Sequence, residues 1–176
     1  MTNCRSLHFR VGRCIAVIMM FLTHTSSIAL SRVGTVGITD LNGIPCFSIP
    51  NNSETRNGLP LYGLFINELP SGEDHDSLPH SIWSFRATDY NALPKIFPKH
   101  CIPFGESPNG TTQRTLESLQ LLKVYSVYLQ AKREGSSRDG YSGEFCIKPA
   151  GSGKTFVQVI DVDYSLGDAR FGDCKK

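Results

Sequence analysis

The stretch that decides the fold runs from Val36 to Ile49 and reads VGITDLNGIPCFSI. It places two short runs rich in apolar and β-branched residues, Val36 to Asp40 and Pro45 to Ile49, on either side of Asn42-Gly43. Asn-Gly readily takes the positive φ angles of a tight turn, so the stretch predicts a β-hairpin.

Similar short runs continue to the end of the chain, separated by Gly, Pro, Asn and Ser. Phe145 and Ile147 alternate with Cys146 in one of them, as expected of a strand with one buried face. Thr112 to Leu122 leaves two interpretations open, one or two helical turns or a lead into the next strand. The further predicted strands are 61–69, 81–87, 99–104, 123–131, 143–148 and 155–163.

About eight short strands, without strand–helix alternation, predict an all-β fold: an antiparallel, immunoglobulin-like β-sandwich with little helix. Trp83 is the only tryptophan and lies in the middle of a predicted strand. We expect it to be a core residue packed near a disulfide.

The first 29 residues have the layout of an export signal. Three arginines (Arg5, Arg10 and Arg13) and no acidic residue precede the end of a short apolar core, Cys14 to Leu22, and small residues follow at positions 27 and 29. The apolar run is well short of the roughly 20 residues that span a bilayer as a helix. We therefore expect removal of residues 1–29, a single domain over 30–176 and no stable membrane insertion.

Removal of the signal changes both the cysteine count and the charge. Cys46, Cys101, Cys146 and Cys174 remain, and an oxidising compartment predicts that they form two disulfides, with three connectivities open. Three of the 18 Lys and Arg residues leave with the signal, so 15 face 16 Asp and Glu residues and the formal net charge is −1. No basic run with interleaved aromatics remains, which argues against nucleic acid as a partner.

Two motifs imitate ligand-binding loops. The run from Gly151 to Thr155, GSGKT, lacks the earlier glycine of a phosphate-binding loop because that position is Lys148, so we predict a hairpin turn. Asp161 and Asp163 have calcium-loop spacing, but Leu166 and Gly172 occupy the required Gly and Glu positions.

The best metal candidate is an acidic loop with two histidines. Imidazole and carboxylate groups suit zinc, but prolines flank this loop and no regular spacing brings the groups together, so we expect a solvated loop and no metal or cofactor. The candidate residues are Glu73, Asp74, His75, Asp76 and His80.

The sequence offers little for catalysis. After the signal the histidines are His75, His80 and His100, no Gly-x-Ser-x-Gly turn occurs, and paired cysteines leave no thiolate. We therefore do not expect an enzyme. A convergent pair of carboxylates for sugar hydrolysis stays open, because separation in space is not visible in the sequence.

The order of features resembles small bacterial periplasmic proteins, often lipoproteins, assigned as type VI secretion immunity proteins. The resemblance lies in scattered short matches: the Asn-Gly turn before Pro45-Cys46-Phe47, the pair Ile82-Trp83, the run 101–105 (CIPFG), the run 123–127 (KVYSV), and Tyr141 before Phe145-Cys146-Ile147.

The resemblance implies that Cys46 and Cys101 are partners, and our predicted connectivity, Cys46–Cys101 with Cys146–Cys174, comes from it. It also implies a periplasmic location. Cys14 stands at the start of the apolar core, directly after Arg13, instead of following the core, so this chain departs from the lipoprotein pattern and we expect a protein without a lipid anchor.

The function implied by the resemblance is neutralisation of a toxin by direct binding. We expect polar loops at 70–80, 105–115 and 132–142 to carry the contact, with Arg86, Tyr90 and Arg138 as anchors. Alternatives stay open: an envelope structural or accessory sandwich without a toxin partner, such as an adhesin subunit or assembly factor, or a secreted eukaryotic module with glycosylation sites at Asn51 and Asn109.

Overall fold

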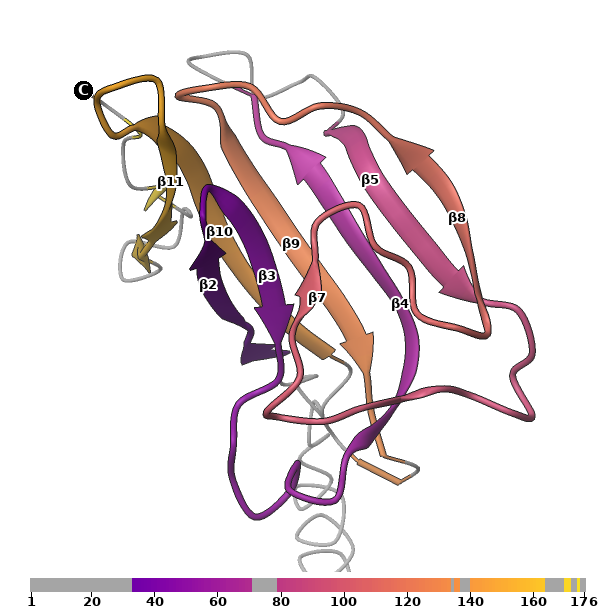
Figure 1. The fold of residues 1–176 in the computed structure, drawn as a ribbon. Coiled ribbons are helices and arrows are strands. Elements are labelled where there is room, and N and C mark those ends of the chain that lie inside the picture. The colour runs from indigo at the N-terminus through magenta and orange to yellow at the C-terminus, as the bar shows by residue number, and fades with distance from the viewer. Residues whose placement is uncertain are drawn as a thin grey trace, which may run out of the picture. The chain divides into compact units, whose positions relative to one another are not determined.

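The computed structural model describes residues 33–70, 79–133, 135–136, 140–163, 170–171 and 174 (Figure 1). The chain divides into the units Met1–Leu30 and Ser31–Lys176, and all described residues belong to the second. The predicted export signal lies outside them. The described residues contain strands, turns and loops but no helix.

The strands are short, and only β4 and β10 reach ten residues. In chain order they are β1 Val33–Thr35, β2 Gly37–Leu41, β3 Ile44–Ser48, β4 Leu59–Glu68, β5 His80–Ala87, β6 Lys95–Ile96, β7 Ile102–Pro103, β8 Thr111–Leu116, β9 Val124–Ala131, β10 Gly140–Pro149, β11 Thr155–Ile160, β12 Val162–Asp163 and β13 Arg170–Phe171.

Two sheets form the sandwich-like body (Figure 1). The large sheet has the order β1-β10-β9-β4-β5-β8, with β11 added to β10 and β6 added to β4. The small sheet has the order β2-β3-β7, and β12 pairs separately with β13. All named pairs are antiparallel except β1 with β10. The predicted all-β, mostly antiparallel architecture is confirmed, while its immunoglobulin-like character stays a prediction.

The hairpin predicted from Val36 to Ile49 is present as β2 and β3. Asn42 and Gly43 form its turn with φ angles of 56° and 88°. The Gly43 amide donates a hydrogen bond to the Asp40 carboxylate over 2.6 Å. Turn chemistry and strand pairing therefore agree here, which is why this stretch could be predicted from local sequence alone.

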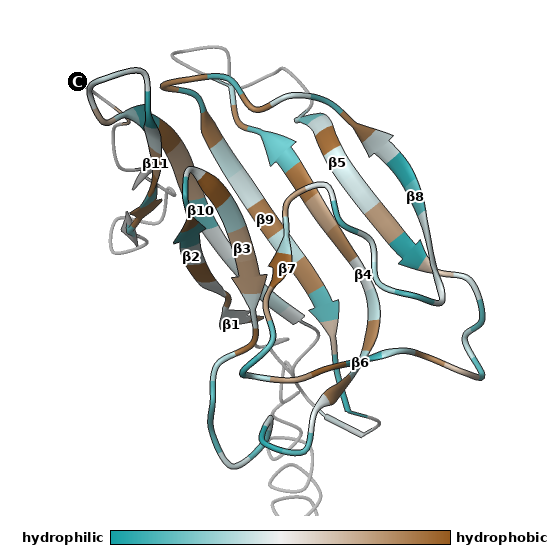
Figure 2. Cartoon of the chain, viewed as in Figure 1, coloured by the Kyte–Doolittle hydropathy of each residue, from teal (hydrophilic) through white to brown (hydrophobic). Residues whose placement is uncertain are grey.

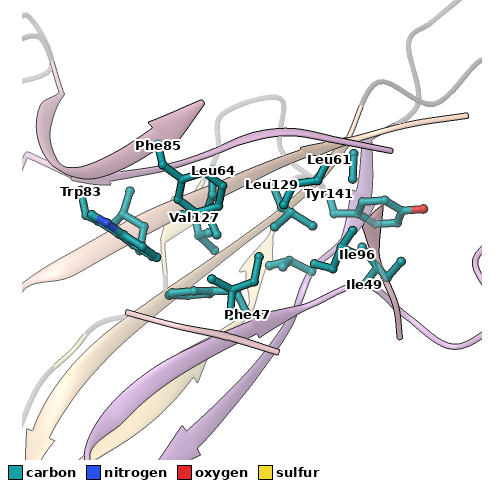
Figure 3. Packing of buried hydrophobic residues seen from close by; sticks show 14 of the residues in the cluster. Phe47, Ile49, Leu61, Leu64, Trp83, Phe85, Ile96, Val127, Leu129 and Tyr141 are labelled. Carbon is teal, nitrogen blue, oxygen red and sulfur yellow. The ribbon is translucent and has the colours of Figure 1, made fainter. Parts of the chain in front are cut away.

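The hydrophobic core fills the space between the two sheets (Figure 3). Phe47 from the small sheet meets Trp83 and Phe145 from the large sheet, with ring centroids 6.3 Å and 5.5 Å away. Trp83 is fully buried, as predicted, and its neighbour Phe47 directly follows Cys46. Buried and partly buried residues alternate along β9, so this strand turns one face to the core; β9 is labelled in Figure 2.

Two segments differ from the sequence prediction. Thr112 to Leu116 is neither a helix nor a connecting segment, because it belongs to β8 and pairs with β5, whereas residues 117–122 lead into β9, as one of the two alternatives had it. The threonines of β8 suit a pleated edge strand better than a helix. The strand predicted over 99–104 shrinks to Ile102–Pro103, although the Phe104 amide still donates a hydrogen bond to the Pro45 carbonyl over 2.9 Å.

Both predicted disulfides are present, with the predicted connectivity. Cys46–Cys101 links β3 to the segment entering β7 and closes a separation of 55 residues. Cys146–Cys174 links β10 to the C-terminal end of the chain over 28 residues. Cys46 and Cys146 are fully buried.

Candidate functional site

A group of aromatic side chains and one arginine lies on the face of the large sheet that points away from the small sheet. Along β4, Leu64 and Ile66 enter the core, so Phe65 between them faces outward. Phe65 pairs with Ser84 of β5 and Tyr128 of β9, and directly paired residues share a face. We call Tyr62, Phe65, Arg86 and Tyr90 the aromatic patch.

Arg86 stacks on Phe65 within this patch. Its guanidinium carbon lies 5.0 Å from the centroid of the Phe65 ring. Gly63 pairs with Arg86 across the strands, and a Cβ atom on Gly63 would lie 3.4 Å from the Phe65 ring and only 2.7 Å from the Phe85 carbonyl oxygen. The glycine therefore lets the ring lie against the backbone and lets the guanidinium lie over the ring.

Tyr90 extends the patch from the loop that follows β5. Its ring centroid lies 6.1 Å from that of Tyr62, with an interplanar angle of 36°. Tyr90 is 61 % exposed, the most exposed large hydrophobic side chain of the described residues. Tyr62 and Phe65 are half-buried, whereas Arg86 and Tyr90 are exposed. The patch therefore has two partly buried rings and two side chains that a partner could reach.

The arrangement suits recognition of another protein more than chemistry. Arginine and tyrosine are enriched at binding hot spots because they combine large contact area with directed hydrogen bonds. A guanidinium that already lies on a ring loses less side-chain freedom when it binds a carboxylate or a carbonyl. The ring contact itself contributes about 0.5–1 kcal/mol at an exposed site.

The structure describes two of the three predicted anchor residues. Arg86 lies over Phe65, and Tyr90, four residues further along the chain, packs against Tyr62, whereas Arg138 lies outside the described residues. Sequence reasoning missed Tyr62 and Phe65. The outward aromatic between Leu64 and Ile66 was the available signal, but only strand pairing could place it under Arg86.

The glycine-rich run and the candidate metal residues were among the other motifs noted in the sequence. Gly151 to Thr155 forms the predicted turn between β10 and β11, where the Lys154 amide donates to the Gly151 carbonyl over 3.0 Å. Of the metal candidates, Glu73, Asp74, His75 and Asp76 lie outside the described residues. His80 pairs with Glu117 at 2.9 Å, and this hydrogen bond and charge raise the pKa of the imidazole.

A search of the described residues finds no group of three or more His, Cys, Asp and Glu side chains that could hold a metal ion. The same part of the chain contains no helix with the length and apolar character needed to cross a membrane.

Comparison with known proteins adds no relative: no family model, no curated protein and no solved structure matches the chain. The aromatic patch and the fold are therefore the observations on which a function has to be argued.

Proposed function

We propose that this chain is an exported, disulfide-stabilised binding protein of the periplasm that neutralises a secreted toxin by direct contact, like the type VI secretion immunity proteins that its sequence resembles. The observation that carries the proposal is the stack of Arg86 on Phe65 beside the Tyr62–Tyr90 pair. A neutraliser of this kind needs a rigid surface that fits the toxin and needs no reaction of its own.

Two features support a preorganised binding surface. Phe65 and Arg86 stand on neighbouring strands of the large sheet, so their spacing is fixed by the ladder. The two disulfides restrain the small sheet and the end of the chain. Surfaces that are ordered before binding lose less conformational entropy in the complex.

The proposal assigns no enzymatic activity. All four cysteines after the expected signal are in disulfides, so none of them is available as a thiolate nucleophile. The partner surface should offer carboxylates or carbonyl oxygens to Arg86 and an apolar or ring-bearing contact to Tyr90.

The first test is capture of secreted effectors from the host with the oxidised protein comprising residues 30–176. We expect one effector to bind stoichiometrically and to lose its toxic activity in the complex. An effector that binds but keeps full activity, or no bound effector in the complete set, would overturn neutralisation and favour the envelope accessory protein.

The second test locates the contact. The variants Arg86→Ala and Tyr90→Ala should each weaken effector binding at least about tenfold, the loss expected for a hot-spot residue. Arg56→Ala is the matched control, because Arg56 is an exposed arginine in the β3–β4 loop and is not part of the aromatic patch. Equal affinities for all three variants and the wild type would remove the patch from the proposal.

A further inference from the structure

A second feature lies on one edge of β10, away from the aromatic patch. Two strands share this edge: β1 pairs with Gly140 to Ser142, and β11 begins pairing at Glu144. Leu122, which leads into β9, donates a hydrogen bond to Ile147 on the opposite edge. The ends of β1 and β11 therefore face each other across a gap beside Gly143 (β1, β10 and β11 are labelled in Figure 2).

The gap opens into a cavity of about 370 Å³. Its lining is mixed: Val33 and Val36 on one side and Val159 and Ile160 on the other supply aliphatic surface, and polar groups make up the rest. Glu144 and Asp161 also line the cavity. They are the titratable side chains among its described lining residues. The cavity thus combines an apolar wall with two carboxyl groups.

Glu144 lacks the interactions that normally accompany a buried carboxyl group. The residue is only 9 % exposed, and although its backbone pairs with Ile160 in the ladder, its carboxyl group makes no hydrogen bond or ion pair within the described part of the chain. Burial raises the pKa of its carboxyl group above the ordinary value of 4.5. A buried carboxylate without a partner is costly, so a cation in the cavity would supply the missing interaction.

We propose that this cavity binds an organic cation, namely an ammonium or guanidinium group on an aliphatic stem, with Glu144 and Asp161 receiving the charge and the valine and isoleucine walls receiving the stem. A bare metal ion fits less well, because Ca²⁺ takes six to eight oxygen ligands and zinc prefers nitrogen or sulfur. The proposal stands on the cavity alone and does not depend on toxin binding.

Such a cation has two sources, a free amine or a basic side chain of a polypeptide. Putrescine represents the first source and Nα-acetyllysine methylamide the second. n-Butanol is the uncharged control of similar stem length. Titration calorimetry of the oxidised protein at neutral pH should show saturable binding of at least one amine and none of n-butanol, and the tighter amine identifies the source.

The variant Glu144→Gln separates binding from folding, because it keeps the side-chain shape and removes the buried charge. We expect amine affinity to fall at least tenfold in this variant, and less in Asp161→Asn, whose carboxylate is exposed. The unfolding temperature of Glu144→Gln without ligand should equal or exceed that of the wild type, so lost binding is not a folding defect.

Three results would overturn the proposal: no amine binding by the wild-type protein, undiminished binding by Glu144→Gln, or equal heat from n-butanol. Sodium chloride at the same ionic strength is the control for screening. Heat from this salt equal to that from the amines would count in the same way as equal heat from n-butanol, because the effect would be general electrostatics and the cavity would not be a site.

Discussion

Gly63 shows how one residue sets the geometry of the aromatic patch. A methyl group at this position would press against the Phe85 carbonyl oxygen at 2.7 Å, and neither strand can move without disturbing the ladder. We expect Gly63→Ala to lower the free energy of unfolding by about 1–3 kcal/mol, the usual cost of overpacking. Urea unfolding monitored by tryptophan fluorescence would measure it.

Gly37→Ala is the matched control for this substitution. Its new methyl group would also be close to another atom, at 2.6 Å, but that atom is the Ser48 side-chain oxygen, which can rotate away. The control should therefore cost clearly less stability than Gly63→Ala. Equal costs at the two positions would contradict the role given to the rigid backbone contact.

Glu144 predicts a specific dependence of stability on pH. Its pKa is raised in the folded protein, so between about 4.5 and the raised value the folded state holds a proton that the unfolded state has lost. Its contribution to stability therefore falls as pH rises through this window. The advantage of Glu144→Gln over the wild type should be small at pH 4 and larger at pH 7.

Unfolding in urea at several pH values between 4 and 7.5 would measure this difference. Comparing the two proteins cancels the titration of every other group, so only the Glu144 contribution remains. A constant difference across the range would show that the Glu144 carboxyl titrates alike in the folded and unfolded states.

At the scale of elements, β7 depends on the disulfide beside it. β7 has only two residues, Ile102 and Pro103, and pairs with β3 directly next to the Cys46–Cys101 bridge. Replacing Cys46 and Cys101 by alanine should cost about 4 kcal/mol by the entropy of closing a chain loop of this length. The amide of Ile102 and its neighbours should then exchange hydrogen faster than those of β4.

Replacing Cys146 and Cys174 provides the comparison, because that bridge closes a shorter separation of 28 residues and does not touch β7. This variant should lose slightly less stability and leave exchange in β7 unchanged. Faster exchange in β7 in both variants would mean that general destabilisation, not the local bridge, controls the strand.

The elements that were predictable are those whose local pattern agrees with their pairing. The hairpin at Asn42-Gly43, the alternating strand β9 and the apolar runs of β4, β5 and β10 carry their own signal. β1 and β6 are two or three residues long and exist only because a partner strand is present. β8 was missed because its polar threonines and glutamine suit an edge strand, where pairing decides more than hydrophobicity.

At the scale of the molecule, the sites depend on which strands become neighbours. The sequence suggested Arg86 and Tyr90 as anchors, which stays a prediction, and Phe65 joins Arg86 only through the β4–β5 register. The cavity at Glu144 arises where two strands meet one edge of β10, an arrangement that no local pattern encodes. The connectivity of the cysteines came from the family resemblance, since spacing alone allowed three solutions.

The parallel pairing of β1 with β10 has a consequence for the timing of folding. Val33 at the start of the domain pairs with Gly140, and Gly34 pairs with Tyr141. β1 can therefore pair only after β10 has been synthesised. Pairings this distant in sequence form slowly. While the chain is being made, β1 has no β10 with which to pair until residues 140–142 are present, and its backbone groups stay free for other contacts throughout that interval.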